Sequence, residues 1–305
     1  MQKNKCSKER LMRIASYCSI LTALSLIIIK VISFFMTNSL ALLSSLMDSG
    51  LDIGASVVSF IAVQQALLPP DKEHRFGHGK AEALGGIVQG FIIACSGVFL
   101  LIETVSHILH PVPLERLDVG VIVMLISIVA TIVLVSFQKY VIAQTNSIAI
   151  DADSAHYTGD VMMNVGVIVS MMFSYLLGLT WVDAAFAVCV SVYLFYTVYR
   201  IFVKSSAVLM DAELPSETRE AITKIVLNHA HIGSISDLRT RNSGLNSFVQ
   251  FAVKIDSDLD LTQAHKICDE LEQEVKQALP ECEVFIHPEP KKEGAILCKR
   301  KNPKA

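Results

Sequence analysis

The first two thirds of the chain consist of long apolar blocks separated by short polar segments. Crossing about 30 Å of hydrocarbon requires roughly 20 helical residues, and each block meets that length. The blocks cover residues 14–36, 40–66, 83–109, 117–138, 148–176 and 181–203. This pattern predicts a polytopic α-helical membrane domain with six transmembrane helices in residues 1–210. The first block is too long for a secretory signal and no small-residue cleavage site follows it, so we expect it to remain in the mature protein.

The composition agrees with a membrane location. The 305 residues are 52% hydrophobic and 18% charged, with a mean hydropathy of +0.50. Soluble domains carry about 25% charged residues. The net charge is −3 and no basic stripe is present, so the sequence predicts no nucleic-acid partner. The seven cysteines form no CxxC pair, and we assign them no function.

The distribution of lysine and arginine predicts the orientation in the membrane. These residues gather at the N-terminus, in the segment 69–80 and after the fourth and sixth blocks, whereas the opposite loops carry Arg116 alone. Because cytoplasmic loops are enriched in basic residues, we expect both termini in the cytoplasm. Lys30 lies within the first block, 17 residues after Arg13. That separation is about 25 Å of helix, so we expect its side chain to reach the far interface.

After Met210 the pattern changes to that of a small soluble domain. It predicts a helix, a short strand at 235–241, an alternating strand in SFVQFAVKID, an amphipathic helix with Thr262 near its start, and a strand in EVFIHPEP. This α-β-β-α-β order is typical of a two-layer α+β domain, here residues 211–290. Residues 291–305 form a polar, lysine-rich tail.

Two pairs of polar residues interrupt the second and fifth blocks. Asp48 and Asp52 are four residues apart, as are His156 and Asp160, so each pair shares one helix face. A charge at the bilayer centre costs about 2.5–3.5 kcal/mol, and we expect no basic residue of another block at this depth. If the two blocks pack together, three carboxylates and one imidazole converge, which suits tetrahedral Zn²⁺. A proton or Na⁺ site remains an alternative, although the histidine favours a transition metal.

Four protein ligands favour a transported ion over a catalytic one, because a catalytic zinc keeps one position open for water. Ligands of this kind must lose protons before they bind metal. Metal and protons therefore compete for the site, which is the physical basis of metal/proton antiport. We accordingly expect a secondary active transporter and not an enzyme.

Four stretches of the chain resemble the cation diffusion facilitator family, and closely its bacterial zinc and ferrous-iron efflux members. The stretches are SLMDSGLDIGAS, HRFGHGKAEALG, HYTGDVMMN and DLRTRNSG…FVQF…QAH…IHPEP. The resemblance implies a homodimer in the cell membrane, with the bacterial inner membrane as the expected location, and a cytoplasmic ferredoxin-like domain. It implies that Asp48, Asp52, His156 and Asp160 form the transport site. The implied cargo is Zn²⁺, with Cd²⁺ or Fe²⁺ as alternatives.

The same resemblance implies two features of the segment between the second and third blocks. Asp71, His74 and His78 match a second metal site, which lies at an interface in the family. Lys80 matches a family lysine that forms an ion pair with an aspartate just after the sixth helix, here Asp211.

The cytoplasmic domain departs from the family pattern. His265, His287 and Glu289 occupy three ligand positions of the family's two-metal site, with glutamate where aspartate is usual. Ser236 and Ala252 stand where two further histidines are found, and neither side chain replaces an imidazole. We therefore expect one of the two metals to be absent or weakly bound.

Two other functions remain to be weighed. A membrane metal sensor or scaffold that transports nothing would explain the loss of cytoplasmic ligands, although it would not require the intact membrane quartet. A membrane metallohydrolase fits poorly, because the sequence shows no open coordination position and no adjacent nucleophile or general base.

Overall fold

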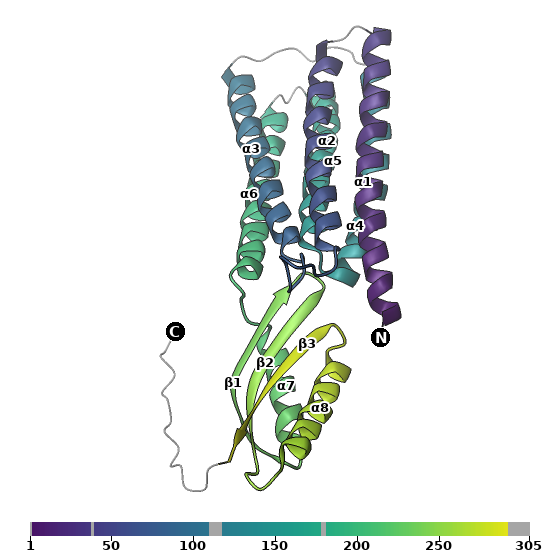
Figure 1. Cartoon of the computed structure of the whole chain (residues 1–305). Coiled ribbons are helices and arrows are strands. Elements are labelled where there is room, and N and C mark those ends of the chain that lie inside the picture. Colours follow the sequence, from purple (N-terminus) through teal and green to yellow (C-terminus); the bar gives the residue numbers. More distant parts are fainter. Residues whose placement is uncertain (1, 38–39, 110–117, 178–180, 292–305) are drawn as a thin grey trace. The chain divides into compact units, whose positions relative to one another are not determined.

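The computed structural model describes residues 2–37, 40–109, 118–177 and 181–291, with the exception of some side chains inside the helices (Figure 1). The chain divides into two compact units. One contains Met1–Met210 together with Ser243–Leu245, and the other contains Asp211–Asn242 and Asn246–Ala305.

The first unit is a bundle of long helices, and each apolar block of the sequence forms one of them. They are α1 (Gln2–Thr37), α2 (Leu40–Ala66), α3 (Ala81–Leu109), α4 (Asp118–Thr145), α5 (Ile148–Leu177) and α6 (Trp181–Leu209). Helices α1, α4 and α6 extend beyond the predicted apolar blocks into polar sequence. Hydropathy alone underestimates the length of these helices, because the backbone hydrogen bonding of each helix continues into its polar ends.

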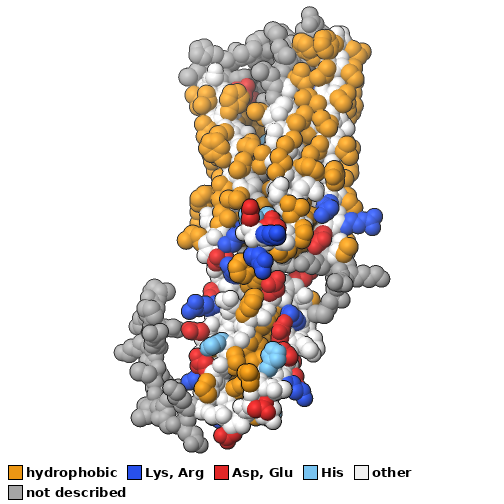
Figure 2. Space-filling model, viewed as in Figure 1, with side chains coloured by type: hydrophobic (Ala, Val, Ile, Leu, Met, Phe, Trp, Pro, Cys, Tyr) orange, Lys and Arg blue, Asp and Glu red, His pale blue; other side chains and the backbone are white. Residues whose placement is uncertain are grey.

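The surface of this bundle is apolar, as expected for contact with lipid. On the face shown in Figure 2, hydrophobic side chains cover most of the helical unit. Phe35, Phe91 and Tyr199 expose 79%, 71% and 69% of their area. Four helices, α1, α3, α4 and α6, contain segments long and apolar enough to cross a membrane. Among the described residues α2 and α5 do not qualify, and both carry acidic residues inside.

Small residues allow the ligand-bearing helices to pack closely. A Cβ atom added at Gly85 on α3 would lie 2.3 Å from the Cβ atom of Ala62 on α2. One added at Gly159 on α5 would lie 2.7 Å from Leu194 on α6. Helices α2 and α5 also pack directly against each other. Such close approach is how membrane helices gain packing contacts without a hydrophobic driving force.

The second unit has the predicted α-β-β-α-β order. Its elements are α7 (Ser216–Asn228), β1 (Ile232–Ser243), β2 (Asn246–Ile255), α8 (Leu261–Ala278) and β3 (Cys282–Pro290). The sheet order is β1-β2-β3, and β2 pairs in parallel with β3. Strand β1 is longer than predicted and ends at a turn in which Gly244 has φ +65°. Helix α8 begins at Leu261, so Thr262 is near its start as predicted, and a capping box between Asp260 and Gln263 closes its first turn.

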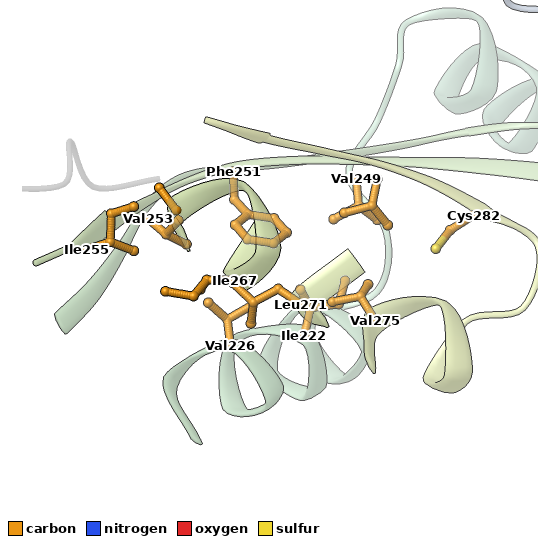
Figure 3. Packing of buried hydrophobic residues seen from close by; sticks show 12 residues of the cluster. Ile222, Val226, Val249, Phe251, Val253, Ile255, Ile267, Leu271, Val275 and Cys282 are labelled. Atoms are coloured by element: carbon orange, nitrogen blue, oxygen red, sulfur yellow. The ribbon is translucent and has the colours of Figure 1, made fainter. Parts of the chain in front are cut away.

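One face of this sheet carries the core of the second unit. Alternate residues of β2 point toward α7 and α8, as Figure 3 shows for Val249, Phe251 and Val253. Leu271 of α8 and Val226 of α7 complete the core and are fully buried. The other face of the sheet carries the side chains of His287 and Glu289, which alternate along β3 with the core residues Val284 and Ile286.

Candidate metal centre

Helices α2 and α5 bring three of the four predicted membrane ligands together. Asp52, His156 and Asp160 each place one ligand atom within 4.8 Å of the others. The His156 Nε2 atom lies 3.1 Å from Asp52 Oδ1 and 3.9 Å from Asp160 Oδ2. Ligands at about 2.0 Å from tetrahedral Zn²⁺ stand roughly 3.3 Å apart, so the cluster is close to the size such an ion requires.

The fourth predicted ligand is Asp48. It lies on α2 one helical turn before Asp52, but its side chain is outside the described part of the structure. The helix therefore places Asp48 on the correct face, and its participation in the site stays a prediction.

A buried polar network holds the helices around this cluster. Asp153 Oδ2 accepts hydrogen bonds from Ser19 Oγ at 2.5 Å and from Gln138 Nε2 at 2.7 Å. Ser56 Oγ lies 3.1 Å from Ser19 Oγ and 2.7 Å from the Tyr157 hydroxyl. All five residues expose 1% of their area or less. The network joins α1, α2, α4 and α5, and it fixes the residues on either side of His156.

The sequence analysis did not identify Asp153 as part of any polar network. The sequence does contain a signal for such a role, because Asp153 is an acidic residue inside the fifth apolar block. Its partners Ser19 and Gln138 come from two other helices, α1 and α4, and sequence periodicity does not show which faces of these helices meet.

The position of Lys30 corrects a second expectation. Its Nζ atom donates a hydrogen bond to Ser49 Oγ of α2 at 2.5 Å, and Ser49 exposes only 2% of its area. The side chain therefore reaches toward the neighbouring helix and not to the far interface. A basic residue of another block therefore contacts α2 at Ser49, the residue next to Asp48 in the sequence, which was not expected.

The segment between α2 and α3 forms a second cluster of possible ligands. Asp71 Oδ1 lies 3.4 Å from His74 Nδ1, and Asp71 Oδ2 lies 3.3 Å from His78 Nε2. The two imidazole rings have centroids 4.5 Å apart. These three residues satisfy the same spacing criterion as the membrane cluster, although Asp71 and His74 are exposed.

A tight turn positions Asp71 within this loop cluster. Its Oδ1 atom accepts the backbone amides of His74 at 2.6 Å and Glu73 at 2.9 Å. These hydrogen bonds, that from His74 above all, lower the pKa of the Asp71 carboxyl below its usual 3.8. The carboxylate is therefore ionised at neutral pH and available to a cation.

The predicted cytoplasmic ligands do not come together within one chain. His265 exposes 76% of its side chain on α8 and lies 3.8 Å from Asp269 of the same helix. His287 and Glu289 follow each other on β3 at alternate positions, so they share the sheet face opposite to the core. Within the described part of the second unit, no three such residues meet the spacing of a metal site.

Lys80 and Asp211 belong to different units, and their predicted ion pair stays a prediction. Lys80 Nζ donates to the backbone oxygen of Leu209 at 3.4 Å. Asp211 Oδ2 lies 3.5 Å from Arg241 NH1.

Two family models match the chain. The model described as the cation efflux transmembrane domain covers residues 16–210. The model described as the cytoplasmic domain of cation efflux proteins covers residues 214–291. Together they account for nearly all of the residues in the two units.

Curated proteins of similar sequence carry the same description. The chain is 39% identical over 281 residues to the cation-efflux pump FieF of Pectobacterium atrosepticum, an alignment that covers 92% of this chain and 93% of that protein. It is 38% identical over 289 residues to FieF of Klebsiella pneumoniae, which covers 93% and 94% of the two chains.

Solved structures match about a quarter of the chain. A structure of CzrB in its zinc form is 35% identical and covers 27% of this chain and 94% of that one, with a TM-score of 0.25. From the family models and the curated relatives, we conclude that the chain belongs to the cation diffusion facilitator family, is of the FieF type, and is a multi-pass membrane transporter for metal cations and not an enzyme.

Proposed function

We propose that this protein exports Zn²⁺ from the cytoplasm across the cell membrane in exchange for protons, with Cd²⁺ and Fe²⁺ as further cargo. The proposal includes six transmembrane helices, α1 to α6, with both termini in the cytoplasm of a bacterium. The working unit is a homodimer that joins through its cytoplasmic, ferredoxin-like domains. Asp48, Asp52, His156 and Asp160 hold the metal during transport.

The cluster of Asp52, His156 and Asp160 is the observation that carries this proposal. Its ligand atoms come from two different helices and lie within 4.8 Å of one another. His156 exposes only 6% of its side chain. Imidazole nitrogen and carboxylate oxygen are ligands that Zn²⁺ and Fe²⁺ accept. A site shared by α2 and α5 also changes shape when these helices move relative to each other, which a transport site requires.

The hydrogen bond between His156 and Asp52 supports proton coupling. At 3.1 Å, one proton lies between His156 Nε2 and Asp52 Oδ1, whichever atom carries it. In this proposal the metal-free site carries one proton more than a neutral imidazole and an ionised carboxylate, and a metal that takes both atoms as ligands releases that extra proton. When the site opens to the other side of the membrane, a proton that returns to the same position competes with the metal and favours its release.

The loop cluster has a supporting role in this proposal. Asp71, His74 and His78 bind a second metal ion that stabilises the segment between α2 and α3. Lys80 and Asp211 form an ion pair that strengthens the dimer. In the cytoplasmic domain, His265, His287 and Glu289 retain one weak metal position.

Zinc uptake into inside-out vesicles with an imposed pH gradient tests the transport function. Replacement of Asp160 by asparagine keeps the shape of the side chain and removes its charge, so we expect uptake to fall about 100-fold or more. The matched control is Asp183→Asn, because Asp183 is an exposed acidic residue at the start of another membrane helix, α6. Normal uptake by Asp160→Asn, in protein that folds normally, would refute the assignment of the site.

The same purified proteins, reconstituted in proteoliposomes, distinguish an exporter from a metal sensor or scaffold. A sensor binds Zn²⁺ but produces no flux, whereas an exporter moves Zn²⁺ and protons in opposite directions. A flux of Zn²⁺ that is unaffected when the pH gradient is abolished would support export without proton coupling.

A further inference from the structure

Lys30 is the basic residue of α1 that contacts the ligand-bearing helix α2. Its Nζ atom donates to Ser49 Oγ at 2.5 Å. The acceptor is buried, with 2% of its area exposed, and Lys30 itself is half-buried, so this contact lies where α1 packs against α2. The four-carbon stem of lysine is long enough to span the gap between two packed helices.

The position of Ser49 places this ammonium group beside the candidate metal site. Ser49 directly follows Asp48 in the chain and precedes Asp52 by three residues. Residues three apart on a helix are neighbours, with about 5–6 Å between their Cβ atoms. Lys30 is therefore held within about one helical turn of the Asp52 carboxylate, which contacts His156 at 3.1 Å.

Two other basic residues of the membrane helices, Arg200 and Lys204, contact an aspartate of α5. Arg200 NH2 and Lys204 Nζ of α6 lie 3.2 Å and 3.4 Å from the carboxylate of Asp151. Asp151 is in the first turn of α5, five residues before His156. These two residues neutralise an acidic group at the helix end, and they provide a natural comparison for Lys30.

Two carboxylates on one face of α2 attract any cation, and a lysine ammonium and a divalent metal ion repel each other. The two cations therefore compete for one acidic face. A divalent ion that also gains the imidazole of His156 has more charge and more ligands than an ammonium group. A monovalent ion such as Na⁺ has neither advantage.

We propose that Lys30 is a built-in counter-ion of the acidic face of α2, which occupies that face when no metal is bound and excludes monovalent ions from it. Binding of a divalent cation displaces the ammonium group from the carboxylates. When the site opens outward, the returning ammonium group helps to release the ion. Lys30 is thus a residue that sets specificity and release, and this role rests on the proposed function of the site.

Zinc titration of the purified full-length protein tests this inference. The background carries His74→Ala, His78→Ala and His287→Ala, which removes candidate ligands outside the membrane. In this background we expect Lys30→Met to bind Zn²⁺ about tenfold more tightly, because one nearby positive charge is gone. We expect 300 mM NaCl, compared with choline chloride, to weaken this binding about threefold in Lys30→Met and much less in the parent protein.

Three further variants make the outcome decisive. Lys30→Arg keeps the charge and should bind like the parent, whereas Lys30→Gln should resemble Lys30→Met and serves if the methionine variant does not fold. Lys204→Met removes a membrane lysine away from the site and should leave zinc affinity unchanged. If Lys30 is only a structural contact, Lys30→Met and Lys30→Gln will bind Zn²⁺ as the parent does or more weakly, without sensitivity to Na⁺, and the inference is overturned.

The assignment of the transport site is tested separately in the same experiment. Asp52→Asn in the same background should abolish binding of Zn²⁺. If the parent binds Zn²⁺ and Asp52→Asn binds it equally well, the proposed transport site is wrong. If Asp52→Asn loses binding but Lys30→Met and Lys30→Gln gain none, the site is correct and the role of Lys30 is wrong.

Discussion

The membrane bundle and the cytoplasmic domain both carry histidine and carboxylate side chains that suit a metal, but they position them differently. Asp52, His156 and Asp160 meet because α2 and α5 pack together. In the cytoplasmic domain, His287 follows β3 on the outer face of the sheet. His265 projects from α8, which packs on the opposite face. The sheet itself therefore separates these two residues within one chain.

The difference shows how burial turns a set of side chains into a site. An acidic pair in an apolar helix is costly unless a cation or a proton compensates its charge. The membrane cluster therefore has to be occupied by something at every stage, whether a metal ion, a proton or the ammonium group of Lys30. Water solvates the exposed cytoplasmic residues, so they remain stable without any metal.

The largest effect is expected when one candidate ligand is removed from each region in turn. Asp52→Asn should lower zinc transport about 100-fold or more, because it removes a ligand and a buried charge that no neighbouring group replaces. His287→Ala should change transport by about threefold or less, since the exposed side chain lacks a complete ligand set. Both are measured as initial uptake into vesicles with equal amounts of protein. A larger loss from His287→Ala than from Asp52→Asn would reverse the comparison.

The second test is the dependence of zinc affinity on pH. Each proton that the metal displaces makes affinity rise about tenfold per pH unit while the site is protonated. One proton shared by His156 and Asp52 therefore predicts an increase of up to about 100-fold between pH 6 and pH 8. The measurement is a zinc titration of full-length protein without the loop histidines. An affinity that is constant over this range would show that the shared proton is not displaced.

The sequence predicted the helices and the proximity of His156 and Asp160 well, because both depend on local spacing. The period of the α-helix places His156 and Asp160 on one face whatever lies around them. The direction of Lys30 could not be predicted in the same way. A long side chain inside an apolar block can reach an interface or a neighbouring helix, and only the packing of α1 on α2 decides between them. The partners of Asp153 could not be predicted for the same reason, since they come from two other helices, α1 and α4.

The cytoplasmic ligands illustrate a different limit. His287 and Glu289 occupy alternate positions of β3, so they share one face of the sheet. The sequence of one strand does not show its register with the neighbouring strand. That register decides which residues of β2 lie beside His287 and Glu289. In the structure Ala252 is the neighbour of His287, and Lys254 is the neighbour of Glu289. Lys254 therefore places a positive charge next to the candidate ligand Glu289.

The register of β2 and β3 provides the third test, a gain of function. Parallel strands lie about 4.8 Å apart, so Ala252→His would place a second imidazole directly beside His287. We expect zinc affinity of the cytoplasmic domain to rise about tenfold, which narrows the difference between the two regions. The measurement is a zinc titration of full-length protein that carries Asp52→Asn and lacks the loop histidines. The matched control is Gln250→His, two residues away on the same face. Equal affinity in both variants would show that adjacency to His287 does not create the site.

The smallest expected effect concerns the loop, which is intermediate between the two regions because it is exposed but already assembled. Because the pKa of Asp71 is lowered, its carboxylate stabilises the turn fully at pH values above the usual pKa of 3.8. This stabilisation is lost as the pH falls through the lowered pKa. At neutral pH Asp71 is ionised and releases no proton when metal binds, so the loop adds nothing to proton coupling through this residue.

Asp71→Asn keeps an oxygen that can accept the amides of Glu73 and His74 while it removes the charge. We expect transport to fall only about threefold, because water screens an exposed charge, and its dependence on the pH gradient to stay as in the unmodified protein. Asp71→Ala removes both the charge and the hydrogen bonds, and the additional loss between the two variants measures the turn itself. The assay is vesicle uptake at several pH gradients. A changed dependence on the gradient in Asp71→Asn would mean that the loop takes part in proton coupling, and the sharp distinction between the buried and the exposed cluster would then fail.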